Sequence, residues 1–381
     1  MTTKIKELII RIIWSIFSFF PIQKRKIVIS CFEGKSLQDN PKYIAEELLK
    51  NNENDYKIIC LCNLKTDDLD KRIKVKSNFF IFRIFHLCTA KIWIDNCRKA
   101  YYTKKKDNQF YIQTWHGGMG LKQIEYDVLE NLSYDYVKWM DADTKNMDLL
   151  ISDSEFISAY FKRVFRFDGE IMQCGLPRCD IFQDIAFKAN TRRDLLKKLN
   201  INEDKKIILY APTFRNDRST DKFSLDFESL LLDLNKAGED YVILLRLHPN
   251  LSMLKRNIYD NKSIIDVTSF SNMQELLILA DYLITDYSSC MFDFIHLNKP
   301  CFLYVPDMDD YLKERKFLMD INELPFPKVK QYTDLLCFLK GDTQYDFIKA
   351  YQLAYKKYGI VECGNASRVL HTWIDEKIKN T

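Results

Sequence analysis

Short apolar runs alternate with amphipathic stretches along most of this 381-residue chain, and no other feature restricts the fold as strongly. Such alternation is typical of parallel strands joined by crossover helices in α/β proteins. One amphipathic stretch, 43–50, lies between the first two runs. Strands are predicted at 26–32, 56–62, 91–95, 110–115, 149–152 and 171–175 in the first half, and at 206–211, 241–247, 264–267, 282–285 and 301–305 in the second.

The length of the chain exceeds what one hydrophobic core usually organises, which favours two domains. A polar stretch at 189–204 predicts a helix and a linker between the two halves. We therefore predict a Rossmann-like domain over 23–188 and a second one over 189–345. Residues 346–381 should form C-terminal helices, which could pack back on the first domain.

The segment 1–22 is apolar from Leu8 to Phe20 and is followed by the basic cluster Lys24-Arg25-Lys26. It is too short and too interrupted to span a bilayer. A secretory signal would need small residues at a cleavage site, and this chain has Pro21 and basic residues there instead. We expect an amphipathic helix that holds the protein peripherally on the cytoplasmic face of the membrane. The alternative is a helix docked on the protein's own core.

Composition excludes several classes of protein. The eleven cysteines contain no C-x-x-C pair or zinc pattern, which indicates reduced thiols in a cytosolic protein. The net charge of +4 comes without a basic recognition motif, so nucleic acid is not an expected partner. The sequence allows a homo-oligomer without indicating one.

His116 follows the predicted strand 110–115, and three glycines (Gly117, Gly118 and Gly120) lie within the next four residues. An imidazole at the end of a strand can move a proton. Backbone without side chains lets an anionic group come close. This combination predicts a catalytic site rather than a packing arrangement.

Cationic and hydroxyl side chains follow three strands of the second half. Because open parallel sheets bind ligands beyond the carboxyl ends of their strands, these groups should meet on one rim and suit a phosphate-bearing ligand. Two of them are serines where a helix begins, which can bind phosphate or act only as a cap. The residues are Thr213, Arg215, Arg246, His248, Ser288 and Ser289.

Two further residues have both functional and structural interpretations. Asp293, about a turn into the helix after Ser289, could accept a ribose hydroxyl or form a surface salt bridge. Arg178, in the run Gly175-Leu-Pro-Arg178, could reach across the cleft to a pyrophosphate, although Gly and Pro also suit a plain turn.

Metal and cofactor motifs are weak or missing. Asp141-Ala-Asp143 is similar to the metal-binding D-x-D of some sugar transferases, but its polar, helix-like surroundings favour a solvated face. The sequence has no Walker loop, and its glycine cluster lacks the spacing of a dinucleotide site. We expect neither a metal nor a cofactor.

The order of five motifs resembles the CDP-glycerol glycerophosphotransferase family, which includes teichoic acid primases and polymerases and related capsule enzymes. The resemblance covers about Lys26 to Asp307. It implies a GT-B arrangement of two Rossmann-like domains that face a cleft. The motifs are Trp115-His-Gly with Leu121-Lys122, Gly175-Leu-Pro-Arg178, Ala211-Pro-Thr-Phe-Arg215, Arg246-Leu-His-Pro249 and Thr285-Asp-Tyr-Ser-Ser-x-x-x-Asp293.

The resemblance also implies an activity: transfer of a polyol phosphate from CDP-glycerol or CDP-ribitol to a hydroxyl of a lipid-linked glycan, with release of CMP. His116 resembles the family's catalytic base, and His248 with Arg246 resembles the pair that contacts the pyrophosphate. The other donor-binding candidates are Gly117, Gly118, Arg178, Thr213, Arg215, Ser288, Ser289 and Asp293.

This chain departs from the family in two ways. Gly118-Met119-Gly120 replaces the Thr-Pro of the usual His-Gly-Thr-Pro-Leu-Lys motif, so the acceptor specificity of the family does not carry over to this chain. The long amino-terminal extension of the larger polymerases is also missing, so primase-like or capsule-type transfer is as consistent as polymerisation. The competing hypotheses are a GT-B nucleotide-sugar glycosyltransferase and a non-catalytic membrane scaffold.

Overall fold

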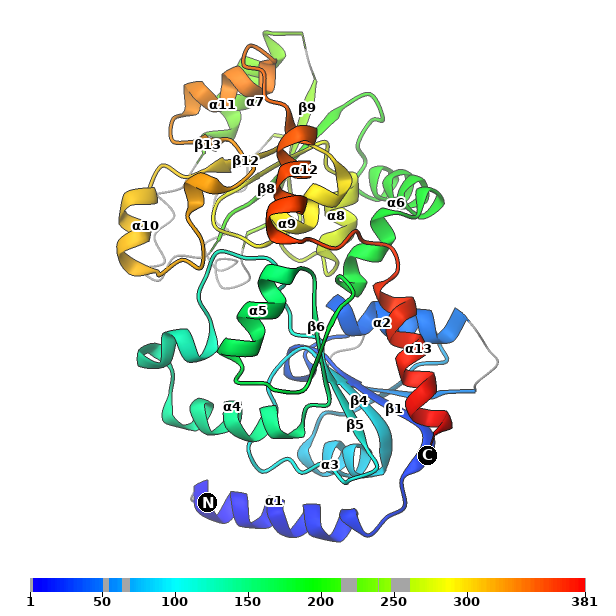
Figure 1. Ribbon diagram of the computed structural model, residues 1–381. Coiled ribbons are helices and arrows are strands. Elements are labelled where there is room, and N and C mark those ends of the chain that lie inside the picture. Colours follow the sequence, from blue (N-terminus) through cyan, green and yellow to red (C-terminus); the bar gives the residue numbers. More distant parts are fainter. Residues whose placement is uncertain are drawn as a thin grey trace. The chain divides into compact units, whose positions relative to one another are not determined.

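A computed structural model describes residues 3–50, 55–63, 69–213, 225–238, 240–247 and 261–380. The chain forms two compact units, which Figure 1 shows in different parts of the colour range. The first unit comprises the chain up to Gly118, Ile124–Asp180, and the residues from Ile360 onward. The second comprises Met119–Gln123 and Ile181–Gly359. The sequence boundary at 188/189 falls inside a helix of the second unit, which begins at Ile185.

The first unit is built on a seven-stranded sheet in the order β3-β2-β1-β4-β5-β6-β7, with every neighbouring pair parallel. All six residues of its β4 are buried, as expected of an inner strand covered on both faces. The strands are β1 (Gln23–Ser30), β2 (Lys57–Leu61), β3 (Lys74–Lys76), β4 (Ala90–Asp95), β5 (Phe110–Gln113), β6 (Leu149–Ser152) and β7 (Glu170–Gln173).

Helices connect these strands. Two of them, α4 and α5, start with a serine whose hydroxyl accepts a hydrogen bond from a backbone N–H of the first turn, which satisfies an otherwise orphaned donor. The helical segments are α1 (Thr3–Ser18), η1 (Phe32–Gly34), α2 (Asp39–Lys50), α3 (Phe80–Thr89), η3 (Glu125–Asn131), α4 (Tyr134–Asn146), α5 (Glu155–Val164), η4 (Pro177–Phe182) and α13 (Ala366–Lys379).

The C-terminal helix α13 completes the first unit by packing on α2 (Figure 1). The carboxylate of Asp180 accepts hydrogen bonds from the backbone N–H groups of Gly364, Ala366 and Ser367, at 2.9, 3.0 and 2.7 Å. These bonds fix the start of α13, where the backbone donors have no partner within the helix. The segment from Ile360 onward is therefore tied to a residue that directly precedes the main part of the second unit, Ile181–Gly359.

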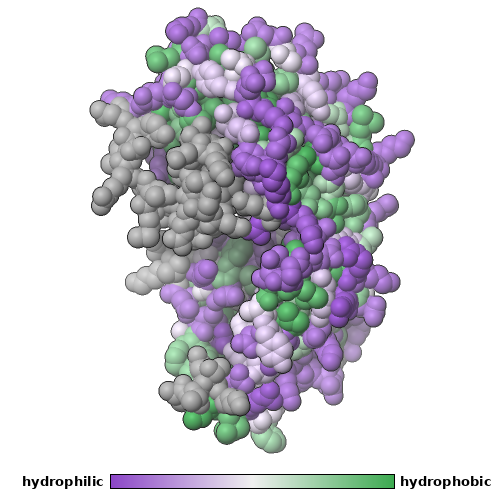
Figure 2. All heavy atoms as spheres, turned by 90° about the vertical axis from the view of Figure 1, so that its left-hand side faces the viewer, coloured by the Kyte–Doolittle hydropathy of each residue, from purple (hydrophilic) through white to green (hydrophobic). Residues whose placement is uncertain are grey.

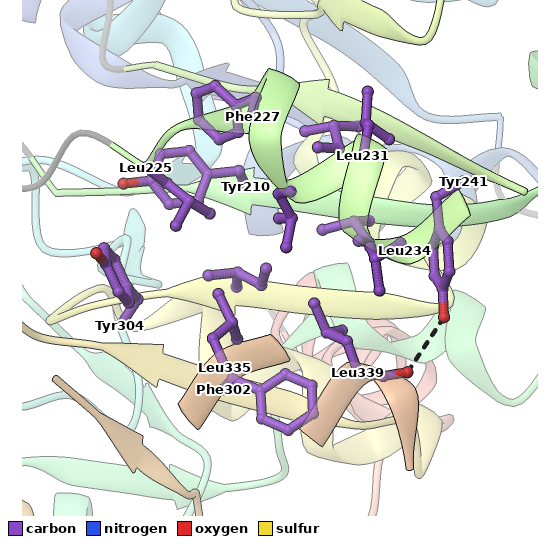
Figure 3. Packing of buried hydrophobic residues seen from close by; sticks show 14 of the residues in the cluster. Tyr210, Leu225, Phe227, Leu231, Leu234, Tyr241, Phe302, Tyr304, Leu335 and Leu339 are labelled. Carbon is purple, nitrogen blue, oxygen red and sulfur yellow. Dashed lines mark hydrogen bonds between the residues drawn. The ribbon is translucent and has the colours of Figure 1, made fainter. Parts of the chain in front are cut away.

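The second unit is built on a six-stranded parallel sheet in the order β10-β9-β8-β11-β12-β13. Figure 3 shows part of its core, where Tyr210, Phe227, Leu231 and Leu234 lie on the side of β8 and α7, and Leu335 and Leu339 come from α11. The strands are β8 (Lys206–Ala211), β9 (Tyr241–Leu245), β10 (Ile264–Asp266), β11 (Tyr282–Thr285), β12 (Cys301–Tyr304) and β13 (Lys328–Val329).

The helices of the second unit follow the same βαβ scheme. In α6, the side chain of Asp184 caps the first turn by accepting from the N–H of Phe187. The helical segments are α6 (Ile185–Lys198), α7 (Phe227–Asn235), α8 (Met273–Leu279), α9 (Cys290–Phe294), η6 (Ile295–Leu297), α10 (Met308–Glu314), η7 (Ile321–Glu323), α11 (Tyr332–Lys340) and α12 (Phe347–Tyr358).

Each sheet has a point at which its strand order reverses, between β1 and β4 in the first unit and between β8 and β11 in the second. Crevices at such points, beyond the carboxyl ends of the strands, are where doubly wound sheets bind their ligands. The two parallel sheets confirm the α/β class predicted from the sequence. The point of reversal in each sheet marks where that unit could bind a ligand.

Helix α1 has features of both structures considered for the N-terminal segment, the membrane-associating amphipathic helix and the helix docked on the protein's own core. Ile10 and Trp14 are buried against the first unit, where the Trp14 ring meets Trp93 edge-on and its Nε1 donates to the carbonyl of Lys104 at 3.0 Å. The opposite face leaves Ile5, Leu8, Ile9, Ile12 and Ile16 exposed. The helix is thus docked on the protein's own core and still presents an apolar surface.

Candidate functional site

His116 lies in the loop that follows β5, one residue after a strained position. Trp115 has φ 50°, a left-handed conformation that a bulky residue seldom adopts and that costs roughly 1–3 kcal/mol. The carbonyl of Trp115 accepts hydrogen bonds from the Nδ2 of Asn40 at 3.3 Å and from the hydroxyl of Thr114 at 3.0 Å. These bonds, with the burial of the indole, hold the turn that brings His116 out of the sheet to an exposed position.

The imidazole of His116 is oriented by one backbone contact. Its Nδ1 lies 3.0 Å from the carbonyl oxygen of Asn96, the residue after β4. Because a carbonyl can only accept, Nδ1 carries the hydrogen and Nε2 is left with a free lone pair. The ring also packs beside the rings of Trp115, at 4.4 Å, and Phe32, at 6.1 Å between centroids. The arrangement suits a general base that takes a proton at Nε2.

A buried polar network holds the backbone of His116. The Nη1 of Arg178 donates to the carbonyl of His116 at 3.1 Å and to the Oδ1 of Asp39 at 2.9 Å. The Oδ2 of Asp39 accepts from the Nδ2 of Asn96 at 2.8 Å, so one carboxylate links both segments that position the imidazole. Asp39 is the first residue of α2 and has φ 56°, a second strained position in the same cluster.

The contacts of Arg178 in the structure differ from the pyrophosphate contact that the sequence suggested. Its guanidinium is buried within the first unit and contacts Asp39 and the carbonyl of His116. A contact with the donor's pyrophosphate stays a prediction. Sequence reasoning missed Asp39, Asn40 and Asn96, although Asp39-Asn40-Pro41 directly before the predicted helix at 43–50 is a pattern typical of a helix start.

The two glycines after His116 have different surroundings. A Cβ on Gly117 would meet only the Cδ1 of Trp115 at 3.9 Å, so its backbone is open to a ligand. A Cβ on Gly118 would lie 1.9 Å from the Oδ2 of Asp153 and 2.9 Å from the Cδ1 of Leu176. Gly118 is thus required by packing inside the first unit, whereas Gly117 keeps the open backbone expected of a site that an anion approaches.

In the second unit, the ends of β8 and β11 are joined beside the reversal of strand order. The N–H of Thr213 donates to the Oδ1 of Asp286 at 2.8 Å, and the hydroxyl of Thr285 donates to the carbonyl of Ala211 at 2.7 Å. Asp286, which is buried, also accepts from its neighbour's backbone N–H. This places Thr213 at the carboxyl edge where a donor nucleotide was expected.

Arg246 follows β9 and turns its side chain toward the next loop. Its Nη1 donates to the carbonyl of Phe270 at 2.5 Å, and burial lowers the pKa of the guanidinium. Arg246 thus lies at the predicted edge of the sheet. His248 and Arg215, the other two predicted cationic contacts, lie outside the described residues.

Ser288 and Ser289 are half-buried at the start of α9, at the end of β11. Asp293, one turn later, is buried and its Oδ2 accepts from the Nε2 of Gln274 at 3.1 Å. Its surroundings exclude the alternative of a surface salt bridge. The serines lie at the edge that the sequence predicted, and the ribose contact of Asp293 stays a prediction.

The interpretation of Asp141-Ala-Asp143 as a solvated face is wrong for Asp143. Asp143 is buried and pairs with the Nη1 of Arg98 at 3.4 Å, while Arg98 also pairs with Glu125 at 2.8 Å. Burial raises the pKa of Asp143 to about 6, and the nearby Arg98 opposes that shift. Asp141 is exposed and accepts from the hydroxyl of Tyr126. In the described part of the chain, no three His, Cys, Asp or Glu side chains are grouped to hold a metal ion.

The chain is similar to several known proteins along most of its length. A family model described as CDP-Glycerol:Poly(glycerophosphate) glycerophosphotransferase matches residues 12–375. The chain is 34% identical over 377 residues to a teichoic acid poly(glycerol phosphate) polymerase of Staphylococcus epidermidis, covering 94% of this chain and 51% of that protein. It is 30% identical over 391 residues to a polymerase of the same name from Bacillus spizizenii, covering 96% of each.

A structure of the wall teichoic acid polymerase TagF superposes with a TM-score of 0.86 at 30% identity, covering 99% of this chain and 96% of that one. The chain spans about half the length of the Staphylococcus epidermidis polymerase and nearly all of the Bacillus spizizenii polymerase.

Proposed function

The chain belongs to the CDP-glycerol:poly(glycerophosphate) glycerophosphotransferase family, and on that basis we propose that it transfers a polyol phosphate from a CDP-polyol to a hydroxyl of a membrane-linked acceptor. Glycerol phosphate is the first candidate for the transferred group, because the relatives that match along most of this chain include poly(glycerol phosphate) polymerases. The structural observation that carries the proposal is the orientation of His116, whose Nε2 is left free at the end of β5.

The chemistry follows from this orientation. The acceptor hydroxyl attacks the β-phosphorus of the CDP-polyol, and Nε2 of His116 takes the hydroxyl proton as the new P–O bond forms. The bond from the β-phosphorus to the bridging oxygen breaks, and CMP leaves with that electron pair. A phosphate monoester has a second pKa of about 6, so CMP needs little protonation as it departs. In phosphoryl transfer the protein mainly positions the reactants and stabilises charge.

The donor belongs, in this proposal, at the carboxyl edge of the second unit's sheet. Thr213 and Ser288 lie at the ends of β8 and β11, where the strand order reverses, and Arg246 follows the neighbouring β9. Cationic and hydroxyl groups at that edge suit a diphosphate. The family resemblance adds Arg215, His248, Ser289 and Asp293 as further donor contacts.

Membrane attachment is supported by the exposed apolar face of α1. Helix α3 packs beside it, with the rings of Phe17 and Phe85 5.5 Å apart, and leaves Phe82 exposed. Figure 2 shows hydrophobic atoms along the lower edge of the view, where α1 lies in Figure 1. Among the described helices, none reaches the length and apolarity that crossing a bilayer requires. We assign these two helices to the cytoplasmic surface of the membrane, with Lys24 and Arg25 near anionic headgroups.

Release of CMP in a donor panel tests the proposal. The protein is incubated with CDP-glycerol, CDP-ribitol or UDP-sugars and a diphosphate-linked disaccharide acceptor, and the products are identified by mass. Polyol phosphate added to the acceptor with equal release of CMP supports the proposal. Transfer from a UDP-sugar would establish the glycosyltransferase alternative. If no donor releases its nucleotide, the result favours the non-catalytic membrane scaffold.

Two histidine variants test the assigned roles. His116→Ala should abolish transfer and leave CDP-glycerol binding nearly intact, whereas His248→Ala should weaken both. Equal loss of donor affinity in the two variants would contradict this division. The number of units added has to be measured, because the Bacillus spizizenii polymerase aligns along 96% of its own length and chain length does not separate one addition from many.

A further inference from the structure

A cavity of about 190 Å³ lies within the first unit, at the carboxyl ends of three neighbouring strands. Its lining includes Ser30, Leu61 and Asp95, the last residues of β1, β2 and β4. The strand order of the sheet reverses between β1 and β4. This is the place where doubly wound sheets bind their ligands, so the fold itself marks the cavity as a candidate site.

The cavity wall combines aromatic surface with charges of both signs. Tyr102 and Trp139 are half-buried members of the lining, and both can offer a flat apolar face. Asp95 pairs with Lys99 at 2.5 Å, and both side chains are more than nine-tenths buried. At this ion pair an ionic ligand of either sign would meet a like charge. The pair favours a neutral ligand with several hydroxyl groups, which can both donate to Asp95 and accept from Lys99.

One polar atom of the lining has no partner. In the described part of the chain, the Oδ1 of Asn78 is buried and makes no hydrogen bond, while its Nδ2 donates to the carbonyl of Glu33 at 2.6 Å. Buried polar atoms are nearly always hydrogen-bonded in native proteins. A side chain of the lining therefore carries an acceptor that the described part of the protein does not use, although the oxygen itself is closed to solvent.

Two segments of the chain contact both the cavity and the imidazole of His116 or carry neighbouring residues that do. The carbonyl of Asn96 orients His116, and the residues on either side of it, Asp95 and Cys97, line the cavity. On a second segment, the ring of Phe32 packs against His116 and the next residue, Glu33, lines the cavity. Two short segments therefore link the cavity wall to the residue proposed as the base.

Helix α3 connects the cavity to the apolar surface. Arg83 and Leu87 of α3 line the cavity, while Ile81 and Phe82 of the same helix are exposed. A molecule whose lipid chain stays in the membrane beside Phe82 can therefore place its head group in the cavity. The guanidinium of Arg83 lies on this route and suits the phosphate that joins head group and lipid.

We propose that this cavity binds a pyranose ring of the membrane-linked acceptor and so selects acceptors that carry a sugar next to the attacking hydroxyl. The inference rests on the proposed function, because it assigns the cavity to the acceptor of that reaction. Drug-sized ligands occupy pockets of about 300 Å³ or more, so a cavity of about 190 Å³ suits a single ring. The apolar C–H face of the ring stacks on Trp139, and its hydroxyls bond to Asp95 and Lys99.

Trp139→Ala tests the assignment. With CDP-glycerol as donor and a disaccharide linked by a diphosphate to a short alkyl chain as acceptor, this variant should raise the acceptor KM at least tenfold. The dissociation constant for CDP-glycerol should change less than twofold. Trp139→Phe keeps a flat ring and should stay within about threefold of the wild-type acceptor KM. The matched control is Tyr134→Ala, because Tyr134 lies on the same helix, is 75% exposed and does not line the cavity.

A second acceptor identifies the ligand class. With an alkyl oligo(glycerol phosphate) that carries no sugar, Trp139→Ala should leave the acceptor KM unchanged. An unchanged KM for the sugar acceptor would overturn the assignment, and so would equal losses with both acceptors. Calorimetric binding of the disaccharide diphosphate without donor keeps this test separate from the reaction itself. If the wild-type protein transfers nothing but binds the disaccharide, and Trp139→Ala does not, the proposed function fails while the cavity assignment stands.

Discussion

Asp39→Asn changes one atom in the network that holds His116, and it should lower both the stability and the turnover of the protein. The Oδ1 of Asp39 accepts from Arg178 and its Oδ2 accepts from Asn96, at 2.9 and 2.8 Å. An asparagine keeps the shape of the side chain but turns one of these acceptors into an NH₂ group. That group then faces a donor, whichever way the amide is oriented.

The magnitude follows from burial. The side chains of Arg178 and Asp39 are 5% and 9% exposed, so the guanidinium loses a carboxylate partner where water cannot replace it. One lost hydrogen bond to a charged group costs about 1.5–3 kcal/mol. We expect the free energy of unfolding to fall by about 3 kcal/mol. Because Arg178 and Asn96 both position His116, we also expect kcat to fall on the order of 10²-fold, the effect of a misplacement of about 1 Å.

Urea unfolding and CMP release under saturating CDP-glycerol measure the two effects. Asp127→Asn is the control, because Asp127 pairs with Arg163 on the surface of the same unit, where the arginine side chain is 61% exposed. Loss of that pair should cost no more than about 1 kcal/mol and leave kcat unchanged. If Asp39→Asn unfolds within 1 kcal/mol of wild type and keeps its kcat, the network does not position the imidazole.

Three further predictions concern single positions. Gly118→Ala should lower the free energy of unfolding by about 1–3 kcal/mol through overpacking against its neighbours, whereas Gly117→Ala should be tolerated, as urea unfolding of both variants will show. Burial foremost, and then nearby lysines, lowers the pKa of His86 from 6.5 to about 4, so the unfolded chain binds the proton first and stability falls as pH drops from 6.5 to 4. His86→Leu should therefore show a shallower loss of unfolding free energy across that window, and an unaltered slope would count against the shift. Ile16→Asp on the exposed face of α1 should reduce sedimentation with anionic vesicles several-fold, while Leu232→Asp, equally exposed on the second unit, should not.

Periodicity and apolar runs were sufficient to predict the α/β class and eleven strands, because inner strands buried on both faces carry continuous apolar runs. The two strands that were missed, Lys74–Lys76 and Lys328–Val329, lie at the edges of the sheets. The first is exposed along its whole length and the second has two residues. Edge strands are often short and charged, so neither leaves a hydrophobic signal in the sequence.

Residues whose own motif indicates chemistry could be predicted from the sequence. Residues that act by positioning another residue could not. The position of His116 after a strand was predictable because it follows an apolar run and precedes three glycines, and its catalytic role stays a prediction. Asp39 and Asn96 were missed because their role depends on contacts between segments 57 residues apart, which no local pattern records. Asp143 was placed on the surface for the same reason, since its partner Arg98 is 45 residues away in sequence.

The return of the chain to its first unit has a consequence for synthesis on the ribosome. Domains usually fold in order as they emerge, the N-terminal one first. Here the backbone donors that satisfy Asp180 belong to Gly364, Ala366 and Ser367, so the unit that carries His116 stays incomplete until the entire second unit has been translated. For that whole interval a nascent chain exposes the surface of α2 that α13 will later cover, and the first unit is completed last although its strands are made first.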